Sequence, residues 1–217
     1  MHGPRHASSR SIIRVFRRDV VLILWDTWLP FSQPAMSSKR LIKELEQYNK
    51  DPSPAVSRLE PVGDDLTQLT AVLVGPAGTA YESMNDFCLF PTRWTEICYY
   101  PETNLTLLSV PDGHWNLSIS VPPSYPNAPP TIHFTTPICH PNIAFQTGEI
   151  CLDLLKTSWT PAYGIVSTLE AVQQLLSAGG EPDSPLNLDI AKLIRQGDLV
   201  GAEGLIRFYT GLYAMGR

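Results

Sequence analysis

Between residues 36 and 214 the spacing of apolar and polar positions changes twice, from helical to alternating and back to helical. At the start of this stretch, apolar residues recur at helical spacing and predict a first helix. Its stripe consists of Leu41, Ile42, Leu45 and Tyr48. We expect Ser37 and Ser38 to cap this helix and Asp51, with the prolines after it, to end it.

Four consecutive segments predict β-strands, because they are rich in strand-forming residues and are bounded by turn residues. They cover residues 55–62, 66–74, 115–121 and 131–135. The third segment is the clearest, since Trp115, Leu117 and Ile119 alternate with polar residues. Strands that follow one another through short turns favour an antiparallel meander.

After residue 164 the apolar spacing is again that of a helix. A stripe from Ile165 to Leu176 ends at Gly179 and Gly180, a second helix is predicted over 188–194, and a third carries apolar positions from Ala202 to Leu212. One helix, four strands and three helices in this order predict an α+β domain, with helices packed against an antiparallel sheet.

Two segments do not fit this domain. Residues 1–35 carry five arginines among serines, which is typical of a presequence or signal; the other interpretation is that translation starts at Met36. Residues 83–112 stand where a short turn is expected, and we expect either a translated retained intron or a surface insertion. The predicted organisation is a leader over 1–35 and a core domain over 36–214, interrupted at about 83–112.

Composition excludes several functional classes. A net charge of −5 with 17% charged residues argues against a basic nucleic-acid-binding face. The four cysteines are too few for a disulfide framework and favour a reducing compartment. The longest apolar stretch, Val20 to Trp25, falls far short of the roughly 20 residues of a membrane-spanning helix.

Reactive side chains are densest between Cys139 and Cys151. Pro141 fixes the backbone in this segment, and Gly148 permits an unusual backbone angle just before Cys151. A cysteine on an irregular segment is placed for exposure, and an exposed thiol can act as a nucleophile.

The residues alone leave other interpretations of this segment open. Cys151 could be a buried cysteine that behaves as a small apolar residue. Cys139, His140 and Cys151 could bind zinc, although no C-x-x-C spacing supports it. His140 could serve Cys151 as the base of a protease-type dyad, with His114 and His133 as the other histidines of the domain. A redox-sensing pair of Cys139 and Cys151 is a further hypothesis.

Longer motifs decide between these interpretations. In chain order they are Pro61 to Asp65, Gly75-Pro76, Thr79 to Glu82, Tyr125-Pro126 with Pro129-Pro130, His140-Pro141-Asn142, Gly148 to Asp153, Trp159 to Ala162 and Pro182 to Asn187. Over about residues 37–210 the chain resembles the ubiquitin-conjugating enzyme family. The resemblance implies that family's fold (the UBC fold): an N-terminal helix, a four-stranded antiparallel meander and C-terminal helices.

The resemblance also implies roles for individual residues. Cys151 would accept ubiquitin from the activating enzyme as a thioester, and Asn142 would stabilise the oxyanion or order the loop that does so. Asp183 and Ser184 would form a gate that orients the incoming nucleophile; the other interpretation of Asp183 is a helix cap. Structural neighbours of this site would be His140, Pro141 and Asp153. The surface that faces the ligase would comprise Pro126, Asn127, Trp159, Pro161 and Ala162.

No metal or bound cofactor is implied, and ATP is used by the activating enzyme. Residues 145–151, 159–163 and 182–187 resemble the fungal peroxisomal branch, of the peroxin-four type. That branch implies a cytoplasmic enzyme at the cytosolic face of the peroxisomal membrane. Its expected partners are ubiquitin, the activating enzyme, a RING-type ubiquitin ligase, an anchoring peroxin and the peroxisomal import receptor as substrate.

Two departures from the family pattern stand beside this interpretation. The spacer from Asn142 to Cys151 is one residue longer than in many members, and Asn127 replaces a bulky apolar residue that many partners of RING-type ligases carry. The alternatives are a carrier for another ubiquitin-like modifier and a catalytically silent binding module with the same fold. The presence of Cys151 argues against the silent module.

Overall fold

The structure is a computed structural model that describes residues 36–82, 113–181 and 184–214. The predicted leader over 1–35, the interruption over 83–112 and Asp183 lie outside the described residues. The elements, in chain order, are α1 (Met36–Lys50), β1 (Val56–Val62), β2 (Asp65–Val74), β3 (His114–Ser120), β4 (Thr131–Phe134), the 3₁₀ turn η1 (Asp153–Leu155), α2 (Ile165–Ser177), α3 (Leu188–Arg195) and α4 (Leu199–Tyr213). This order confirms the predicted α+β succession.

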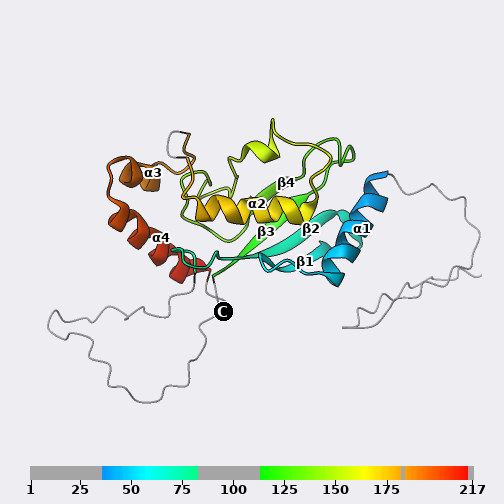
Figure 1. Cartoon of the computed structure of the whole chain (residues 1–217), viewed down its shortest axis with the longest axis horizontal. Coiled ribbons are helices and arrows are strands. Elements are labelled where there is room, and N and C mark those ends of the chain that lie inside the picture. The colour runs from blue at the N-terminus through cyan, green and yellow to red at the C-terminus, as the bar shows by residue number, and fades with distance from the viewer. Residues whose placement is uncertain (1–35, 83–112, 182–183, 215–217) are drawn as a thin grey trace, which may run out of the picture. The chain divides into compact units, whose positions relative to one another are not determined.

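The four strands form one antiparallel sheet in the order β1-β2-β3-β4 (Figure 1). Leu69 of β2 lies opposite Ile119 of β3, and Leu117 of β3 lies opposite Phe134 of β4. Since each strand pairs with the next one in the chain, the predicted meander is confirmed.

Two details at helix ends differ from the prediction. Helix α1 begins at Met36, so Ser37 and Ser38 lie inside it, and their assignment as caps was wrong. Helix α4 begins at Leu199 because the Asp198 side chain accepts a hydrogen bond from the Gly201 amide at 2.9 Å, which is an N-cap that the apolar spacing does not reveal.

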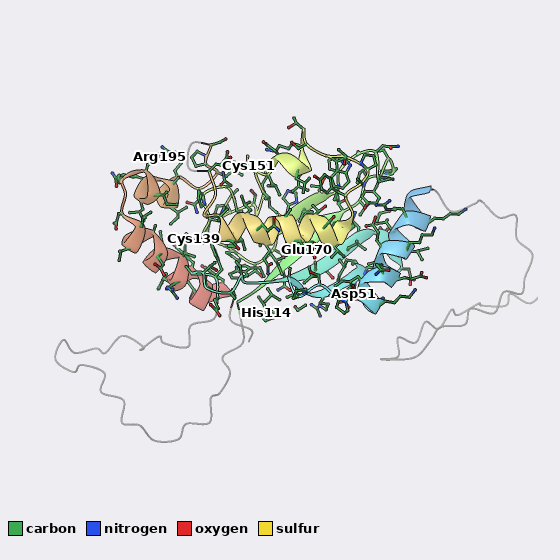
Figure 2. All side chains as sticks on the ribbon, viewed as in Figure 1. Asp51, His114, Cys139, Cys151, Glu170 and Arg195 are labelled. Carbon is green, nitrogen blue, oxygen red and sulfur yellow. The ribbon has the colours of Figure 1, made fainter. Side chains whose placement is uncertain are left out.

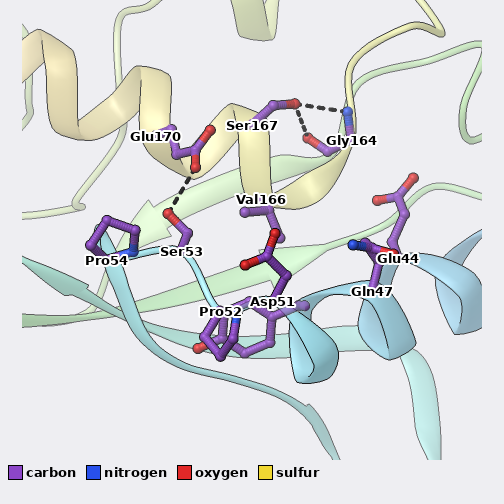
Figure 3. Close-up of a pocket in the computed structure, with 11 residues that line it drawn as sticks. Glu44, Gln47, Asp51, Pro52, Ser53, Pro54, Gly164, Val166, Ser167 and Glu170 are labelled. Atoms are coloured by element: carbon purple, nitrogen blue, oxygen red, sulfur yellow. Dashed lines mark hydrogen bonds between the residues drawn. The ribbon is translucent and has the colours of Figure 1, made fainter.

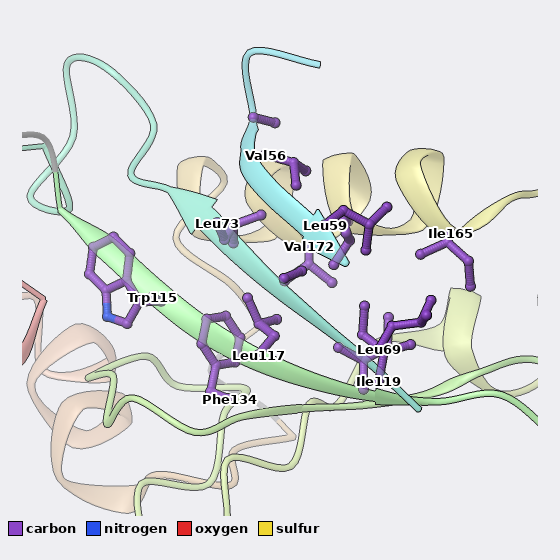
Figure 4. Close-up of a cluster of buried hydrophobic side chains, with 14 of the residues drawn as sticks. Val56, Leu59, Leu69, Leu73, Trp115, Leu117, Ile119, Phe134, Ile165 and Val172 are labelled. Atoms are coloured by element: carbon purple, nitrogen blue, oxygen red, sulfur yellow. The ribbon is translucent and has the colours of Figure 1, made fainter. Parts of the chain in front are cut away.

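The core lies between the sheet and α2, which crosses the sheet (Figure 1). Figure 4 shows Trp115, Leu117 and Ile119 of β3 in the cluster that also holds Ile165 and Val172 of α2. The alternation along β3 places every second side chain in this core, as predicted. Burial of each large aliphatic side chain stabilises the fold by roughly 1.5–3 kcal/mol.

The Glu44 carboxylate connects α1 to the rest of the domain through hydrogen bonds. Glu44 accepts hydrogen bonds from the Tyr125 hydroxyl, at 2.8 and 2.9 Å to its two oxygens, and from the Ile165 amide at 2.8 Å. Arg40 forms an ion pair with the same carboxylate. Because the Ile165 amide opens α2, Glu44 also satisfies a free N–H at the N-terminus of that helix. The first helix, the second helix and the loop at Tyr125 therefore share one anchor.

The described segments on either side of 83–112 meet next to Trp115. The Gly75 amide donates to the Gly113 carbonyl at 2.8 Å. A Cβ atom added to Gly113 would lie 2.6 Å from the Tyr81 carbonyl oxygen. The two described segments therefore come together beside β2 and β3, with Gly113 next to Tyr81, one residue before Glu82.

Deletion of residues 83–112 with a direct Glu82–Gly113 link is expected to preserve the fold. It shortens the connection between β2 and β3 from 39 to 9 residues, roughly two doublings of length at about 0.6 kcal/mol each, so the free energy of unfolding should rise by about 1 kcal/mol. Chemical denaturation followed by circular dichroism measures this change. Loss of a cooperative transition in the deleted chain would show instead that the segment belongs to the core.

Candidate active site

Cys151 ends a short hairpin that is attached to the edge of the sheet. Within the hairpin Ile143 pairs with Ile150, and the Cys151 amide donates to the Asn142 carbonyl at 2.8 Å. The hairpin joins the sheet through the Phe134 amide of β4, which donates to the Gly148 carbonyl at 2.9 Å. The backbone on the N-terminal side of Cys151 is therefore fixed by strand-like pairing.

Gly148 is required for this attachment. Its φ of 69° lies in the left-handed region that glycine adopts readily. A Cβ atom here would lie 1.9 Å from the Phe134 carbonyl oxygen, which leaves no space for a side chain. The glycine that the sequence singles out thus permits both the turn and the close approach to β4.

The Asn142 side chain ties this hairpin to the segment that follows α2. Its amide group donates to the Glu181 carbonyl at 2.9 Å and to the Ser184 carbonyl at 3.3 Å, and its oxygen accepts from the Glu181 amide at 2.6 Å. We call these three hydrogen bonds the Asn142 clasp. They are the contacts expected of a loop-ordering residue, and a role on an oxyanion stays a prediction.

His140 holds the backbone of Asn142, the residue that forms the clasp. It is fully buried; its Nδ1 accepts from the Asn142 amide at 3.1 Å, and its Nε2 lies 3.2 Å from the Leu175 carbonyl. Burial lowers the pKa of His140 to about 4, so the ring is neutral near pH 7, with Nε2 as the donor. Both ring nitrogens of His140 are occupied by the backbone, so the hypothesis that His140 is the base for Cys151 is wrong.

The other residues predicted near the site occupy varied positions. The buried Pro141 accepts at its carbonyl from the amides of Leu186 and Asn187, at 2.8 and 3.0 Å. Ser184 is exposed and contributes its carbonyl to the Asn142 clasp. Asp153 is exposed and opens the 3₁₀ turn η1. Asp183, the other gate residue, lies outside the described residues, so the gate stays a prediction.

The two described cysteines differ in accessibility. Cys151 is partly exposed and its Sγ lies 3.6 Å from Nζ of Lys156, whereas Cys139 is buried under α3 and α4. Burial, followed by the Asp189 carboxylate, raises the pKa of the Cys139 thiol to about 12. In the ranges that the structure describes, no group of three or more His, Cys, Asp or Glu side chains is placed to hold a metal ion. Of these two cysteines, which are labelled in Figure 2, Cys151 is therefore the accessible one.

Comparison with known proteins agrees with this geometry. The profile described as ubiquitin-conjugating enzyme matches residues 110–200. A Gibberella zeae protein named ubiquitin-conjugating enzyme E2 PEX4 is 41% identical over 177 residues, which are 80% of this chain and 86% of that protein. The chain belongs to the ubiquitin-conjugating enzyme family.

Two further relatives indicate a branch of this family. The Dictyostelium discoideum ubiquitin-conjugating enzyme E2 pex4 is 47% identical over 138 residues, covering 61% of this chain and 89% of that protein. The crystal structure of H. polymorpha Pex4p in complex with the soluble domain of Pex22p matches with a TM-score of 0.66 at 30% identity, covering 82% of this chain and 98% of that one. The chain is thus a PEX4-like member, in agreement with the branch that the motifs indicate.

Two of the residues predicted to face a ligase, Trp159 and Pro126, are in direct contact in the structure. Trp159 Nε1 donates to the Pro126 carbonyl at 2.8 Å, and its ring lies against Tyr125 and Tyr163. The other predicted residues of this surface, Asn127, Pro161 and Ala162, are exposed. Because Tyr125 donates to Glu44, this surface is connected to α1. Its use by a ligase stays a prediction.

Three residues that contact or shape the surroundings of Asn142 and Cys151 were not predicted from the sequence. Glu181 acts through its backbone, which carries no residue-type signal, and Gly180 matters for the space that it leaves next to Asn142 and His140. Lys156 stands five residues after Cys151 and reaches it only because η1 turns the chain back. A lysine at this spacing from a candidate nucleophile is the signal that could have identified it.

A cavity of about 380 Å³ lies away from this site, between the end of α1 and the start of α2. Figure 3 shows Asp51, Ser53 and Glu170 at its wall, with Ser53 donating to Glu170 at 2.7 Å. None of the residues predicted for chemistry or ligase contact lines it. The partly exposed Cys151 thiol therefore lies outside this cavity.

Proposed function

We propose that this ubiquitin-conjugating enzyme carries ubiquitin as a thioester on Cys151 and transfers it to an acceptor on another protein. The observation that carries the proposal is the placement of a partly exposed thiol at the end of a hairpin. This hairpin is hydrogen-bonded to β4 on one side and, through Asn142, to Glu181 on the other. Such a thiol is open to a macromolecular donor and still held in one orientation. No group on this chain has to supply energy, since the activating enzyme uses ATP.

The chemistry consists of two acyl transfers. In the first, Sγ of Cys151 attacks the carbonyl carbon of the thioester on the activating enzyme, whose sulfur leaves with the electron pair. In the second, an amine or thiol of the acceptor attacks the new thioester and Cys151 leaves as a thiolate. Both steps pass through an oxyanion next to the hairpin.

Asn142 serves this chemistry by fixing the hairpin against the Glu181 segment. Rigid placement limits the orientations that the thioester samples, which raises the fraction in reach of an acceptor. Asp183 and Ser184, which follow Glu181 in the chain, are proposed to orient the incoming nucleophile. A RING-type ligase is proposed to dock on the surface around Trp159 and Pro126.

The PEX4-like branch suggests a place of action and a partner. We assign the enzyme to the cytosolic face of the peroxisomal membrane, with the import receptor as substrate and a Pex22p-like peroxin as its anchor. The H. polymorpha neighbour was solved with such a domain. Within the described ranges, no helix has the length and apolar character of a membrane span.

Helix α4 offers the surface for this anchor. Phe208 and Leu212, 50% and 47% exposed, lie one turn apart on the side of the helix opposite the buried Thr210. Val200, in the first turn of the same helix, is 84% exposed. Exposed apolar side chains that gather on one helix face mark an interaction site.

Charging with ubiquitin tests the carrier function. Full-length protein incubated with activating enzyme, ATP and ubiquitin should gain one ubiquitin that reductant removes on a gel. Cys151→Ala should abolish this band, whereas Cys139→Ala, at the buried cysteine, should leave it. The deleted chain that lacks 83–112 is charged in parallel.

A band formed with another ubiquitin-like modifier and its activating enzyme, but not with ubiquitin, would overturn the choice of modifier. Absence of charging in both chains with every modifier would favour the silent binding module. Survival of the band in Cys151→Ala would refute the assignment of the nucleophile.

Binding to the soluble domain of a Pex22p-like peroxin tests the anchor. Phe208→Asp should weaken the complex at least about tenfold, because a charge then faces an apolar partner surface. Gln174→Asp, at an exposed position of α2, serves as the control and should bind normally. Isothermal calorimetry supplies both affinities; equal affinities for the two variants would exclude the α4 surface.

A further inference from the structure

Phe145 occupies the turn of the hairpin that ends at Cys151, and the preceding mechanism gives it no role. The Gly148 amide closes this turn by donating to the Ala144 carbonyl at 2.8 Å. Turns favour small and polar residues, and Gln146, which comes next in the turn, is exposed. A large apolar ring at this position therefore has to be explained by what it contacts.

The Phe145 ring packs against helix α4. Its centroid lies 5.0 Å from that of Tyr209, with an angle of 62° between the ring planes, and 6.1 Å from that of Tyr213, with an angle of 68°. Both are edge-to-face arrangements, which aromatic rings prefer. Tyr209 and Tyr213 lie one turn apart on α4 and stack on each other, with centroids 6.0 Å apart. We call these three rings the aromatic brace.

The position of α4 is linked to that of α3 and of the segment before it. Tyr209 packs on the cluster that contains Ile190 of α3 and Ala202 of α4. The segment over residues 184–187 leads directly into α3, which begins at Leu188. Because packed interiors transmit displacements, a shift of α4 relative to the hairpin also moves this segment.

The hairpin and the pair of helices α3 and α4 meet at two points. At the first, next to the Asn142 clasp, the Pro141 carbonyl accepts from the amides of Leu186 and Asn187 at 2.8 and 3.0 Å. At the second, the Phe145 ring contacts α4. A single attachment allows the helix pair to tilt relative to the hairpin, whereas two attachments limit this tilt. They therefore set where the segment before α3 lies relative to the thiol.

Other contacts of α4 lead to the rest of the domain. The His114 amide of β3 donates to the Ala214 carbonyl at 2.8 Å, and the Thr210 hydroxyl donates to the Ala80 carbonyl at 3.3 Å. These bonds do not involve the hairpin, so α4 should stay folded on the domain when the Phe145 ring is removed. The aromatic brace adds a contact to the hairpin itself.

We infer that Phe145 is a positioning residue for the transfer step: through the aromatic brace it fixes the segment over 184–187 relative to the thioester on Cys151. The inference rests on the proposed function, in which Ser184 of this segment helps to orient the incoming nucleophile. Phe145 acts through α4 and this segment, and not on the reacting atoms.

The two acyl transfers should depend on Phe145 to different extents. When Cys151 is charged, its own Sγ attacks, and the activating enzyme presents the thioester. When ubiquitin leaves, a nucleophile from outside has to reach the thioester carbonyl carbon beside the segment over 184–187. Misplacement of a positioning group by about 1 Å can slow such a step by about a hundredfold. Loss of the aromatic brace should therefore slow discharge and spare charging.

Three variants separate positioning from a general effect on the fold. Phe145→Ala removes the ring, and Phe145→Tyr keeps it and serves as the rescue. Phe145 is only partly buried, so the added hydroxyl is not forced into the core. Gln146→Ala is the matched control, because it truncates the exposed neighbour in the same turn.

The experiment charges each full-length variant with activating enzyme, ATP and ubiquitin, and then stops activation. Free cysteine and, separately, free lysine are added as acceptors, and loss of the reductant-sensitive band is followed. Phe145→Ala should discharge at least about fivefold more slowly than the wild type to one or both acceptors, with its charging rate within about twofold. Phe145→Tyr and Gln146→Ala should charge and discharge at the wild-type rates.

Hydrogen exchange supplies the structural measurement. In Phe145→Ala the Leu186 and Asn187 amides, which donate to Pro141, should exchange at least about fivefold faster than in the wild type, while β3 is unchanged. Phe145→Tyr should restore their protection. A general loss of stability would instead speed exchange in β3 as well.

Four results would overturn the inference: unchanged discharge to both acceptors in Phe145→Ala, an equal loss of charging and discharge, no rescue by Phe145→Tyr, or unchanged exchange at the two amides. Each leaves charging and discharge of the wild type intact, so the carrier function stands. Absence of the thioester in the wild type contradicts the proposed function, and the inference falls with it.

Discussion

Three hydrogen bonds of one carboxamide connect the two segments that surround Cys151. The hairpin over residues 143–150 presents the thiol, and the segment from Glu181 to Ser184 follows α2; the Asn142 side chain bonds to both ends of the second segment. Each bond contributes about 1 kcal/mol in its partly buried setting. Without them, the connection of this segment to the site would rest on the hydrogen bonds from the Leu186 and Asn187 amides to the Pro141 carbonyl.

The clasp depends in turn on the core. His140 receives the Asn142 amide because α2 places the Leu175 carbonyl on the other side of the ring. Helix α2 is held over the sheet by Leu169 and Val172, both fully buried, and its N-terminus is fixed by Glu44. A continuous set of contacts therefore runs from Glu44 of α1 to the backbone around Cys151. Glu44 also accepts a hydrogen bond from Tyr125, next to the predicted ligase-facing surface. This continuity explains how a surface thiol is oriented by a distant apolar core.

The elements of the fold could be predicted from the sequence because their apolar periods are long and regular. Alternation along β3 and the stripe of α2 specify both the type of element and the buried side. Helix ends were less predictable, since the start of α4 depends on one side-chain hydrogen bond from Asp198, and Ser37 and Ser38 lie within α1.

The candidate site was predictable only where a residue type signals its role. Cys151, Asn142 and His140 stand in a dense motif. Glu181 contributes backbone atoms, and the contact of Lys156 depends on a 3₁₀ turn of three residues, which is too short to leave a periodic pattern. Contacts of this kind arise from tertiary structure, so they require coordinates.

Hydrogen exchange in a pair of glycine variants tests the clasp most directly. Gly179 and Gly180 have nearly the same φ, 75° and 74°, so alanine is equally strained at both. At Gly180 a Cβ would also lie 2.3 Å from the Asn142 side-chain oxygen, whereas at Gly179 it would meet no atom within 4 Å. If the clasp holds the site, Gly180→Ala speeds exchange of the Glu181 and Cys151 amides at least about tenfold relative to Gly179→Ala, with β3 unchanged in both. Equal exchange at these amides in the two variants would contradict the account.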